Sequence, residues 1–170
     1  MISAILLAAG QSKRMINENK LLKKFNNIHL LQHSINNILL SVVDELIIVL
    51  GHEKETIEKI IEKNKKIRII YNKYYKSGMS SSIKTGLNHL SKNTNYFFIC
   101  LGDMPFVNKD VYNKLINLKK KHDIIIPTYK GQQSNPVLFS NLMIKNVMKI
   151  DGDAGAKKIF KYNKKKNIKY

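Results

Sequence analysis

Residues 7–15 read Leu-Ala-Ala-Gly-Gln-Ser-Lys-Arg-Met, and this stretch decides how the rest of the chain can be arranged. It follows the apolar, partly β-branched run 2–6, which predicts a buried first strand. Gly10 can adopt the backbone angles of a sharp turn, so that backbone N–H groups point at an anion. Ser12 then supplies a hydroxyl, and Lys13, Arg14 and Lys20 supply positive charge. We therefore predict a turn that binds a polyphosphate, because such a group needs N–H donors and cations at fixed positions.

A plain strand-to-helix turn with a solvated basic patch is the alternative, and Arg14 argues against it. The chain has only two arginines, Arg14 and Arg68, among 30 basic residues, so lysine is its default cation. An arginine beside an Ala-Ala-Gly turn indicates a site that needs a planar guanidinium group with several N–H donors. The stretch contains neither G-x-x-x-x-G-K-[ST] nor G-x-G-x-x-G, so its spacing excludes a P-loop and a dinucleotide-binding turn.

Length and composition predict one globular domain over residues 1–170, with a hydrophobic content of 44%. No apolar run is long enough to span a bilayer, and the first strand begins at once without the features of a signal peptide. The single cysteine, Cys100, lies in the apolar run 96–101 and is expected to be a buried core thiol. A reducing cytoplasm is the location that these features favour.

The formal net charge of +18 raises the possibility of a nucleic-acid partner. The basic residues are spread through nearly every segment, however, and no stripe interleaves them with aromatic residues that would stack on bases. We expect a mostly solvated basic surface, with a smaller share of the charge attracting an anionic substrate, and neither nucleic acid nor membrane as partner.

Hydrophobic periodicity predicts strands that alternate with helices along the whole chain. The expected strands are 2–6, 46–50, 68–71, 96–101 and 124–126, and the expected helices are 30–41, 53–66, 78–90, 108–121 and 141–150. We predict a single Rossmann-like, three-layer α/β/α domain with a mostly parallel sheet. With the first four strands in the order 3-2-1-4, the carboxyl ends of the first and fourth strands open a crevice between them. This order brings the Gly10 turn next to the residues that follow the fourth strand.

The fourth strand ends in Gly102-Asp103-Met104-Pro105, which places an acid at the carboxyl end of a buried strand. Such an acid is positioned to hold Mg²⁺ in a triphosphate site, whereas the simpler interpretation is that Asp103 caps a turn. The serine-rich segment 78–82, Gly-Met-Ser-Ser-Ser, opens a predicted helix. Its hydroxyls either cap that helix or, together with free N–H groups, read the edge of a base.

Taken together, these segments resemble the MobA-like nucleotidyltransferase superfamily, which includes the molybdenum cofactor guanylyl- and cytidylyltransferases. The resemblance covers nearly the whole chain. It is carried by residues 7–15 with Lys20-Leu21, by 78–82 with Gly86-Leu87, by 102–105, by 135–139 and by 151–157. The chain is most similar to the cytidylyltransferase (MocA-like) branch.

The chain departs from the family pattern at four places. Ile16 stands where the family has glycine, Ser134-Asn135 stands in place of Gly-His, and Lys157 replaces an arginine. The tail 164–170 lacks the acidic strand and the final helix with which relatives continue, so we expect a shortened domain.

The resemblance implies a nucleotide-diphospho-sugar transferase-like fold and a Mg²⁺-dependent transfer of a nucleoside monophosphate, CMP from CTP, with release of pyrophosphate. It implies catalytic roles for Arg14, Lys20 and Asp103, with Asp103 also holding the metal. The nucleotide would contact Leu7, Ala8, Ala9, Gly10, Ser12, Lys13, Gly78, Ser80, Ser82 and Gly102. Asn135 and Asp153 would lie on the side of the acceptor, for which the resemblance implies molybdopterin, with a molybdoenzyme as recipient of the finished cofactor.

Three alternatives stay open at this point. The acceptor could be a sugar phosphate, phosphocholine or another small phosphate. The protein could be a catalytically weak module that binds a nucleotide or carries a cofactor. The third alternative is a basic nucleic-acid-binding protein, which only the net charge supports.

Overall fold

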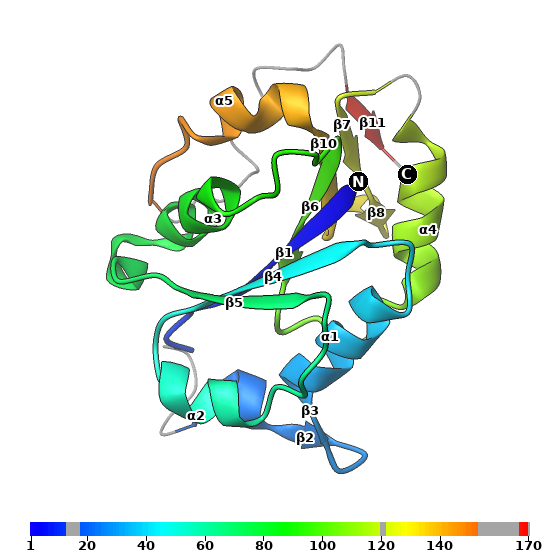
Figure 1. Cartoon of the computed structure of the whole chain (residues 1–170). Helices are drawn as coiled ribbons and strands as arrows, with labels where there is room; N and C mark the ends of the chain where they lie inside the picture. Colours follow the sequence, from blue (N-terminus) through cyan, green and yellow to red (C-terminus); the bar gives the residue numbers. More distant parts are fainter. Residues whose placement is uncertain (13–17, 120–121, 153–166, 170) are drawn as a thin grey trace.

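The computed structural model describes residues 1–12, 18–119, 122–152 and 167–169, the last three by their backbone alone. Its centre is a seven-stranded sheet in the order β11-β7-β10-β6-β1-β4-β5 (Figure 1). The strands are β1 (Ile2–Ala8), β4 (Glu45–Leu50), β5 (Ile67–Tyr71), β6 (Tyr96–Leu101), β7 (Ile124–Ile126), β10 (Val137–Ser140) and β11 (Asn167–Lys169). Only β10 runs antiparallel to its neighbours in this sheet. The predicted mostly parallel sheet and the predicted order of the first four strands are confirmed.

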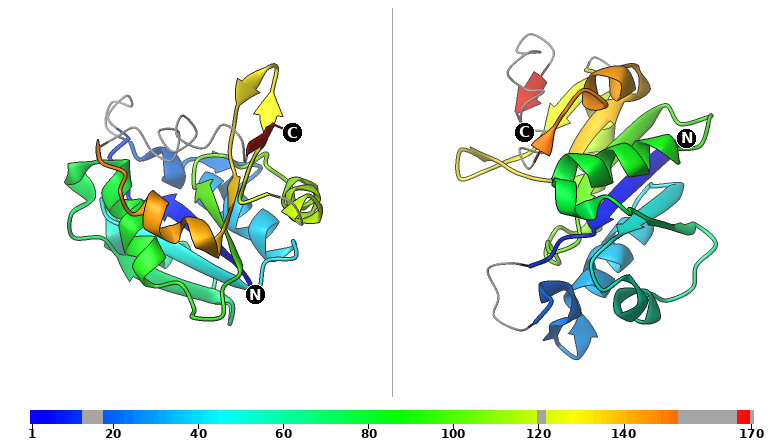
Figure 2. Two further views of the ribbon diagram at one scale, coloured as in Figure 1. Left: turned by 90° about the horizontal axis from the view of Figure 1, so that it is seen from above. Right: turned by 90° about the vertical axis from the view of Figure 1, so that its left-hand side faces the viewer.

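Helices cover both faces of the sheet (Figures 1 and 2). One face carries α1 (Leu30–Leu39), α2 (Lys54–Lys59) and α4 (Lys109–Asn117), and the other carries α3 (Met79–Asn88) and α5 (Ile144–Val147). Successive strand residues point to opposite faces, so β1 sends Leu6 into one buried cluster and Ile5 into the other. The three-layer α/β/α arrangement is therefore confirmed. None of the helices in the described ranges is long and apolar enough to cross a bilayer.

Close packing between the layers explains the position of α3 and the burial of the single thiol. A Cβ atom on Gly86 would lie 2.4 Å from Cγ2 of Ile5, so α3 approaches β1 more closely than a larger residue would permit. Cys100 is buried as predicted, and this burial raises the pKa of its thiol to about 12.

Several elements end earlier than their sequence pattern suggests. The charged helix expected over 53–66 is only α2, which ends at Lys59 in a tighter turn: the N–H groups of Ile60 and Ile61 donate to Ile57 O at 3.2 Å and Glu58 O at 3.1 Å. Asn64 then forms the turn into β5 by accepting hydrogen bonds from the backbone N–H of Lys66 (2.9 Å, side chain) and Ile67 (3.0 Å, backbone). The expected helix 108–121 ends at Asn117, where Leu118 N–H donates to Leu115 O at 3.2 Å in a tighter terminal turn. The expected helix 141–150 consists of a 3₁₀ turn, η4 (Asn141–Met143), followed by α5.

Two small hairpins complete the described fold. A turn at Asn26-Asn27 joins β2 (Lys24–Phe25) to β3 (Ile28–His29), with both asparagines at positive φ. The polar segment 128–134 forms β8 (Thr128–Tyr129) and β9 (Gln132–Gln133). Its tip uses Lys130 and Gly131 at φ 48° and 76°, the left-handed geometry of a tight hairpin.

A buried polar cluster lies at the amino edge of the sheet, where β1, β4 and β5 begin. Glu45 is 6% exposed and accepts hydrogen bonds from Arg68 Nη1 at 2.6 Å, Ser91 Oγ at 2.8 Å and Ser3 Oγ at 2.9 Å. These donors compensate the carboxylate for its lost hydration. Arg68, one of the two arginines, therefore has a structural partner at the edge opposite to the Gly10 turn.

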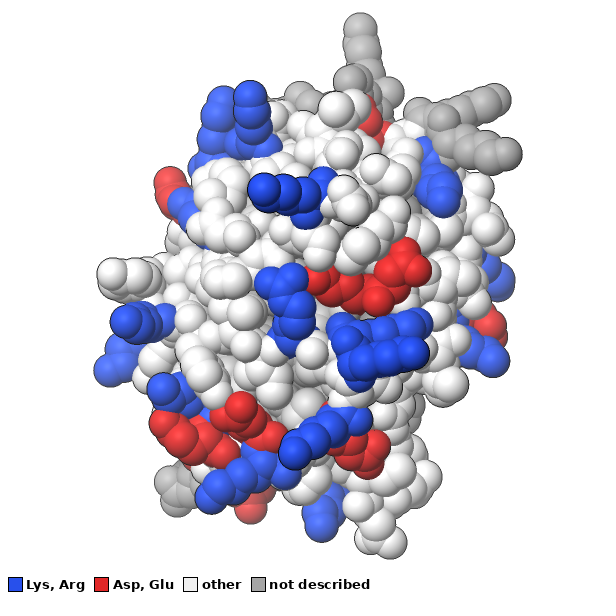
Figure 3. All heavy atoms as spheres, viewed as in Figure 1, with Lys and Arg blue, Asp and Glu red and all other residues white. Residues whose placement is uncertain are grey.

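Basic residues are distributed widely over the surface. In the face shown in Figure 3, Lys and Arg side chains are scattered over several elements and alternate with Asp and Glu side chains. This distribution agrees with the expectation of a mostly solvated basic surface.

Candidate active site

Four segments meet at the carboxyl edge of the sheet, where β1, β4, β5 and β6 end. Backbone hydrogen bonds join them: Gly102 N–H donates to Leu7 O at 3.0 Å, His52 N–H to Ala9 O at 3.3 Å, and Asn72 N–H to Leu50 O at 2.8 Å. Loops that follow neighbouring parallel strands share one edge, which is where α/β proteins bind ligands. The predicted meeting of the Gly10 turn with the segment after β6 is confirmed.

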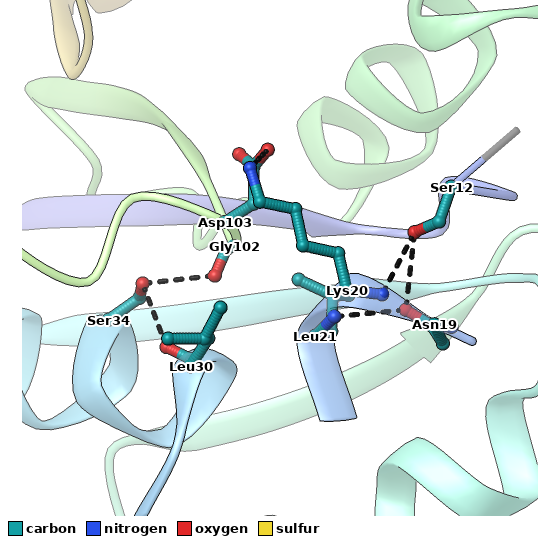
Figure 4. A network of polar contacts seen from close by, with 8 residues as sticks. All are labelled: Ser12, Asn19, Lys20, Leu21, Leu30, Ser34, Gly102 and Asp103. Carbon is teal, nitrogen blue, oxygen red and sulfur yellow. Dashed lines mark hydrogen bonds and ion pairs between the residues drawn. The ribbon is translucent and has the colours of Figure 1, made fainter. Parts of the chain in front are cut away.

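An ion pair joins these two segments. Lys20 opens the 3₁₀ turn η1 (Lys20–Leu22), and its Nζ lies 3.1 Å from Oδ2 of Asp103 (Figure 4). Both side chains are partly exposed, by 45% and 41%, so solvent and ligands can reach the pair. Lys20 and Asp103, both predicted to be catalytic, therefore lie in one site.

Gly102 sets the position of Asp103 against α1. The Ser34 hydroxyl donates to Gly102 O at 3.0 Å (Figure 4), and a Cβ atom on Gly102 would lie 3.0 Å from Cδ1 of Leu31. A glycine therefore lets the end of β6 lie against α1, with Asp103 at the surface.

The first strand is longer than predicted. Three residues expected to contact the nucleotide therefore lie in this strand or directly after it. β1 extends beyond Leu6 because Leu7 and Ala8 continue the parallel ladder with Val49 and Leu50 of β4. Leu7, Ala8 and Ala9 are buried, at 9%, 1% and 4% exposure. The exposed part of the turn therefore begins at Gly10, and only backbone groups of the preceding residues can face a ligand.

Among the described residues of this turn, Ser12 adopts positive φ, at 48°, and Gly10 does not. The Ser12 hydroxyl compensates for this geometry by accepting from Lys20 N–H at 3.2 Å and donating to Asn19 Oδ1 at 3.4 Å (Figure 4). Gly10 has a different property. No atom in the described part of the chain lies within 4 Å of a Cβ placed on it, so the space beside this residue is open.

Asn19 and Glu53 contribute to the site and were missed in the sequence. Asn19 is 6% exposed, accepts from Leu21 N–H at 3.1 Å as the N-cap of η1, and donates from Nδ2 to Glu53 Oε2 at 2.8 Å. An asparagine directly before Lys20-Leu21 is a capping signal that could have indicated the first of these bonds. No local pattern indicates the second bond, since 34 positions separate the two residues.

The serine-rich start of α3 is only partly free to read a ligand. The buried side chain of Asn72 donates to Ser81 Oγ at 2.8 Å and to Ser82 Oγ at 2.9 Å. Ser81 in turn donates to backbone carbonyls, including Gly78 O at 2.8 Å. The hydroxyl oxygens of these two serines therefore each already accept a hydrogen bond from within the protein. Ser80, which is 5% exposed, has no side-chain hydrogen bond within the described ranges.

The remaining expected site residues fall into two groups. Lys13, Arg14 and Asp153 lie outside the described residues. Asn135 precedes β10, whose Val137 pairs with Ile99, so the start of β10 lies beside the carboxyl end of β6. Asn135 is therefore at the same edge of the sheet as Asp103.

Asp103 is a candidate metal ligand at this edge. In residues 1–12, 18–119 and 122–152, no group of three or more His, Cys, Asp or Glu side chains is arranged to hold a metal ion. Asp103 offers hard, accessible oxygens, and Mg²⁺ in nucleotide sites commonly uses one or two carboxylates together with substrate phosphates and water. Asp103 therefore fits a metal ion that arrives with a polyphosphate.

Comparison with known proteins identifies the family of the chain. The family described as MobA-like NTP transferase domain matches residues 4–167. A probable molybdenum cofactor guanylyltransferase of Methanosarcina mazei is 31% identical over 153 residues, which cover 86% of this chain and 67% of that protein. The molybdenum cofactor cytidylyltransferase of Escherichia coli K12 is 29% identical over 139 residues, covering 82% of this chain and 70% of that protein.

Solved structures show the same fold. The crystal structure of Rv0371c from Mycobacterium tuberculosis has a TM-score of 0.89 at 19% identity, covering 99% of this chain and 86% of that one. A nucleotidyl transferase from Methanothermobacter has a TM-score of 0.85 at 19% identity, covering 99% and 87%. The resemblance and the nucleotide-diphospho-sugar transferase-like fold inferred from the sequence are confirmed, and the chain belongs to the MobA-like NTP transferase family.

Proposed function

We propose that this protein transfers CMP from CTP to a phosphate group of molybdopterin and releases pyrophosphate. The observation that carries the proposal is the accessible Lys20–Asp103 pair, with 3.1 Å between Nζ and Oδ2, at the edge of the sheet where Gly10 is exposed. A cation and a carboxylate at this place match the two needs of a metal–triphosphate complex, because one binds phosphate and the other binds the metal.

The side chains and the turn would act by position and charge. The Lys20 ammonium would leave Asp103 for the triphosphate, while the N–H groups of the Gly10 turn and the charges of Lys13 and Arg14 bind the remaining phosphate oxygens. Asp103 would hold Mg²⁺, which supplies further neutralisation of phosphate charge when bound. A phosphate oxygen of the acceptor forms a bond to the α-phosphorus as the bond to the β-phosphate breaks. No protein nucleophile is required, because orientation and charge stabilisation suffice for this displacement.

The preference for CTP rests on the segment that begins at Gly78. Its Gly-Met-Ser-Ser-Ser sequence resembles the base-recognition segment of the family, and the half-buried Gly78 directly before α3 would present backbone groups to a base. GTP is the second candidate, because the relative from Methanosarcina mazei is named a guanylyltransferase. Asn135 and Asp153 would contact the acceptor, and a molybdoenzyme would receive the product.

A thermal-shift panel of the four ribonucleoside triphosphates, with and without Mg²⁺, tests nucleotide binding first. A ligand at 100 times its Kd adds about 2.7 kcal/mol to the stability of the folded state, which is readily measured. We expect the largest shift with CTP and Mg²⁺, and its loss in Asp103→Asn. A larger shift with GTP would replace CTP in the proposal, and no shift with any nucleotide would contradict it.

Pyrophosphate release then separates an enzyme from a binding module. We expect release when molybdopterin, CTP and Mg²⁺ are all present and none when the acceptor is omitted. Release with a sugar phosphate instead would change the acceptor. Binding without any release would favour a catalytically weak nucleotide-binding module.

A further inference from the structure

We infer that the turn between β4 and α2, residues 51–53, is a bracket that holds both limbs of the phosphate-binding turn, with Glu53 and Asn19 as positioning residues. The two limbs are residues 9–12 and residues 18–20, and their role in phosphate binding rests on the proposed function. Nothing in the known family motif quoted above includes either residue.

The bracket contacts the first limb through its backbone. His52 N–H donates to Ala9 O at 3.3 Å, directly before Gly10. Gly51 makes this approach possible, since a Cβ atom there would lie 2.8 Å from Cβ of Ala9 and 2.6 Å from Cβ of Tyr75. The end of β4 can therefore lie against the start of the turn only with glycine at this position.

The bracket contacts the second limb through the Glu53 side chain. Its Oε2 accepts from Asn19 Nδ2 at 2.8 Å, and Asn19 directly precedes Lys20. The amide of Asn19 suits this place because it presents a donor to the carboxylate and an acceptor to the turn. Its Oδ1 accepts from Leu21 N–H at 3.1 Å and from Ser12 Oγ at 3.4 Å.

The two limbs are also tied to each other at their base. Lys20 N–H donates to Ser12 Oγ at 3.2 Å, so the same hydroxyl contacts both Lys20 and Asn19 (Figure 4). The bonds form one continuous path from Glu53 through Asn19 and Ser12 to the backbone of Lys20. That path fixes the backbone of Lys20 while its ammonium reaches Asp103.

Backbone geometry points to the same arrangement. Ser12 and Glu53, the residues at the two ends of the side-chain path, both adopt positive φ, at 48° and 50°. Residues other than glycine rarely adopt this conformation, and they do so mainly where surrounding contacts hold them at functional sites.

A reversal of the hydrogen bond between positions 19 and 53 tests the bracket. Asn19→Asp places two carboxylates opposite each other, and we expect the Kd of CTP–Mg²⁺ to rise by at least about tenfold, as for a lost bond to a charged group. Glu53→Gln keeps an acceptor oxygen and should change Kd by less than about threefold. The double variant N19D/E53Q restores the bond with donor and acceptor exchanged, and its Kd should return to within about threefold of wild type.

Glu55→Gln is the matched control, because Glu55 lies on α2 and its ion pair among the described residues is with neighbouring Lys54, at 3.6 Å. Equal Kd values for Asn19→Asp and wild type would overturn the inference. So would a folded double variant that binds as weakly as Asn19→Asp, because a general loss of structure at position 19 cannot be repaired from position 53.

A second readout needs no nucleotide and so separates this inference from the proposed function. Amide hydrogen exchange at Lys20 and Leu21 should accelerate by at least about tenfold in Glu53→Ala and remain unchanged in Glu55→Gln. Unchanged exchange in Glu53→Ala would overturn the bracket even if CTP binds. Accelerated exchange in a protein that binds no nucleotide would support the bracket and contradict the proposed function instead.

Discussion

Lys20 and Asp103 are 83 positions apart in the chain, yet Nζ and Oδ2 of these residues lie 3.1 Å apart at the carboxyl edge of the sheet. The distance follows from the strand order, because β1 and β6 are neighbours and the segments after them share one edge. Each partner is partly exposed, so a phosphate can take the place of the carboxylate and a metal ion the place of the ammonium.

The first prediction concerns this pair. Lys20→Met and Asp103→Asn should each lower kcat/KM for pyrophosphate release by about 10²-fold, as expected for preorganised charged contacts. Lys23→Met is the control, since Lys23 pairs with the exposed Glu18 at 3.1 Å and should retain wild-type rates. Wild-type kcat/KM in either Lys20→Met or Asp103→Asn would remove that residue from the catalytic set.

The second prediction contrasts the two arginines. Arg14→Ala should lower kcat/KM by about 10²-fold without changing the free energy of unfolding, because its predicted partner is the nucleotide. Arg68→Met should lower the free energy of unfolding by about 1–3 kcal/mol, because Glu45 is buried and would lose its charged donor. Its kcat/KM should not change, since Glu45 lies at the opposite edge of the sheet. Denaturant titration and initial rates on both variants check this contrast, and a stability loss confined to Arg14→Ala would contradict it.

The third prediction concerns Asn72, which orders the start of α3. Asn72→Ala removes the donor that reaches Ser81 and Ser82, and it should lower the free energy of unfolding by about 1–3 kcal/mol. It should also raise KM for CTP, because Gly78 and Ser80 are the groups proposed to face the base. The exposed Asn88, at the last position of α3, provides the control variant Asn88→Ala. A KM equal to wild type in Asn72→Ala would separate this segment from base binding.

The fourth prediction concerns pH. Burial raises the pKa of the Cys100 thiol from 9.0 to about 12, and it raises the pKa of the neighbouring Tyr112 hydroxyl as well. Above about pH 9 the unfolded chain loses these protons while the folded protein keeps them, so the free energy of unfolding falls as pH rises toward 12. Denaturant titrations through this range should show the fall, and Cys100→Ala should make it shallower. An identical slope in the variant would contradict the contribution of Cys100.

Local patterns in the sequence predicted much of the fold and of the site. The apolar run 96–101 coincides with β6, and alternating strands and helices predicted the sheet order that brings Gly10 near Asp103. Helix ends were less predictable. The charged pattern of 53–66 continues past Lys59, but the N–H groups of Ile60 and Ile61 bond to carbonyls three positions back and end the helix there.

Side-chain partners were harder to predict than elements. The serines at 81 and 82 have the pattern of free hydroxyls at a helix start, yet Asn72 binds both. The β11 strand was not predicted because its polar, lysine-rich sequence has no strand pattern of its own. It forms by pairing with the buried β7, where Ile125 is opposite Ile168 in the backbone register.

The sequence by itself determined the α/β class, the position of a turn at Gly10 after the first strand and the acid after the fourth strand, because hydrophobic periodicity and short motifs are local properties. Only the tertiary structure decided that Asn19 is joined to Glu53, that Ser12 rather than Gly10 adopts the left-handed backbone, and that Lys20 reaches Asp103. These features depend on contacts between segments far apart in the chain, and the geometry of such contacts is set by how the strands are ordered and the loops are packed.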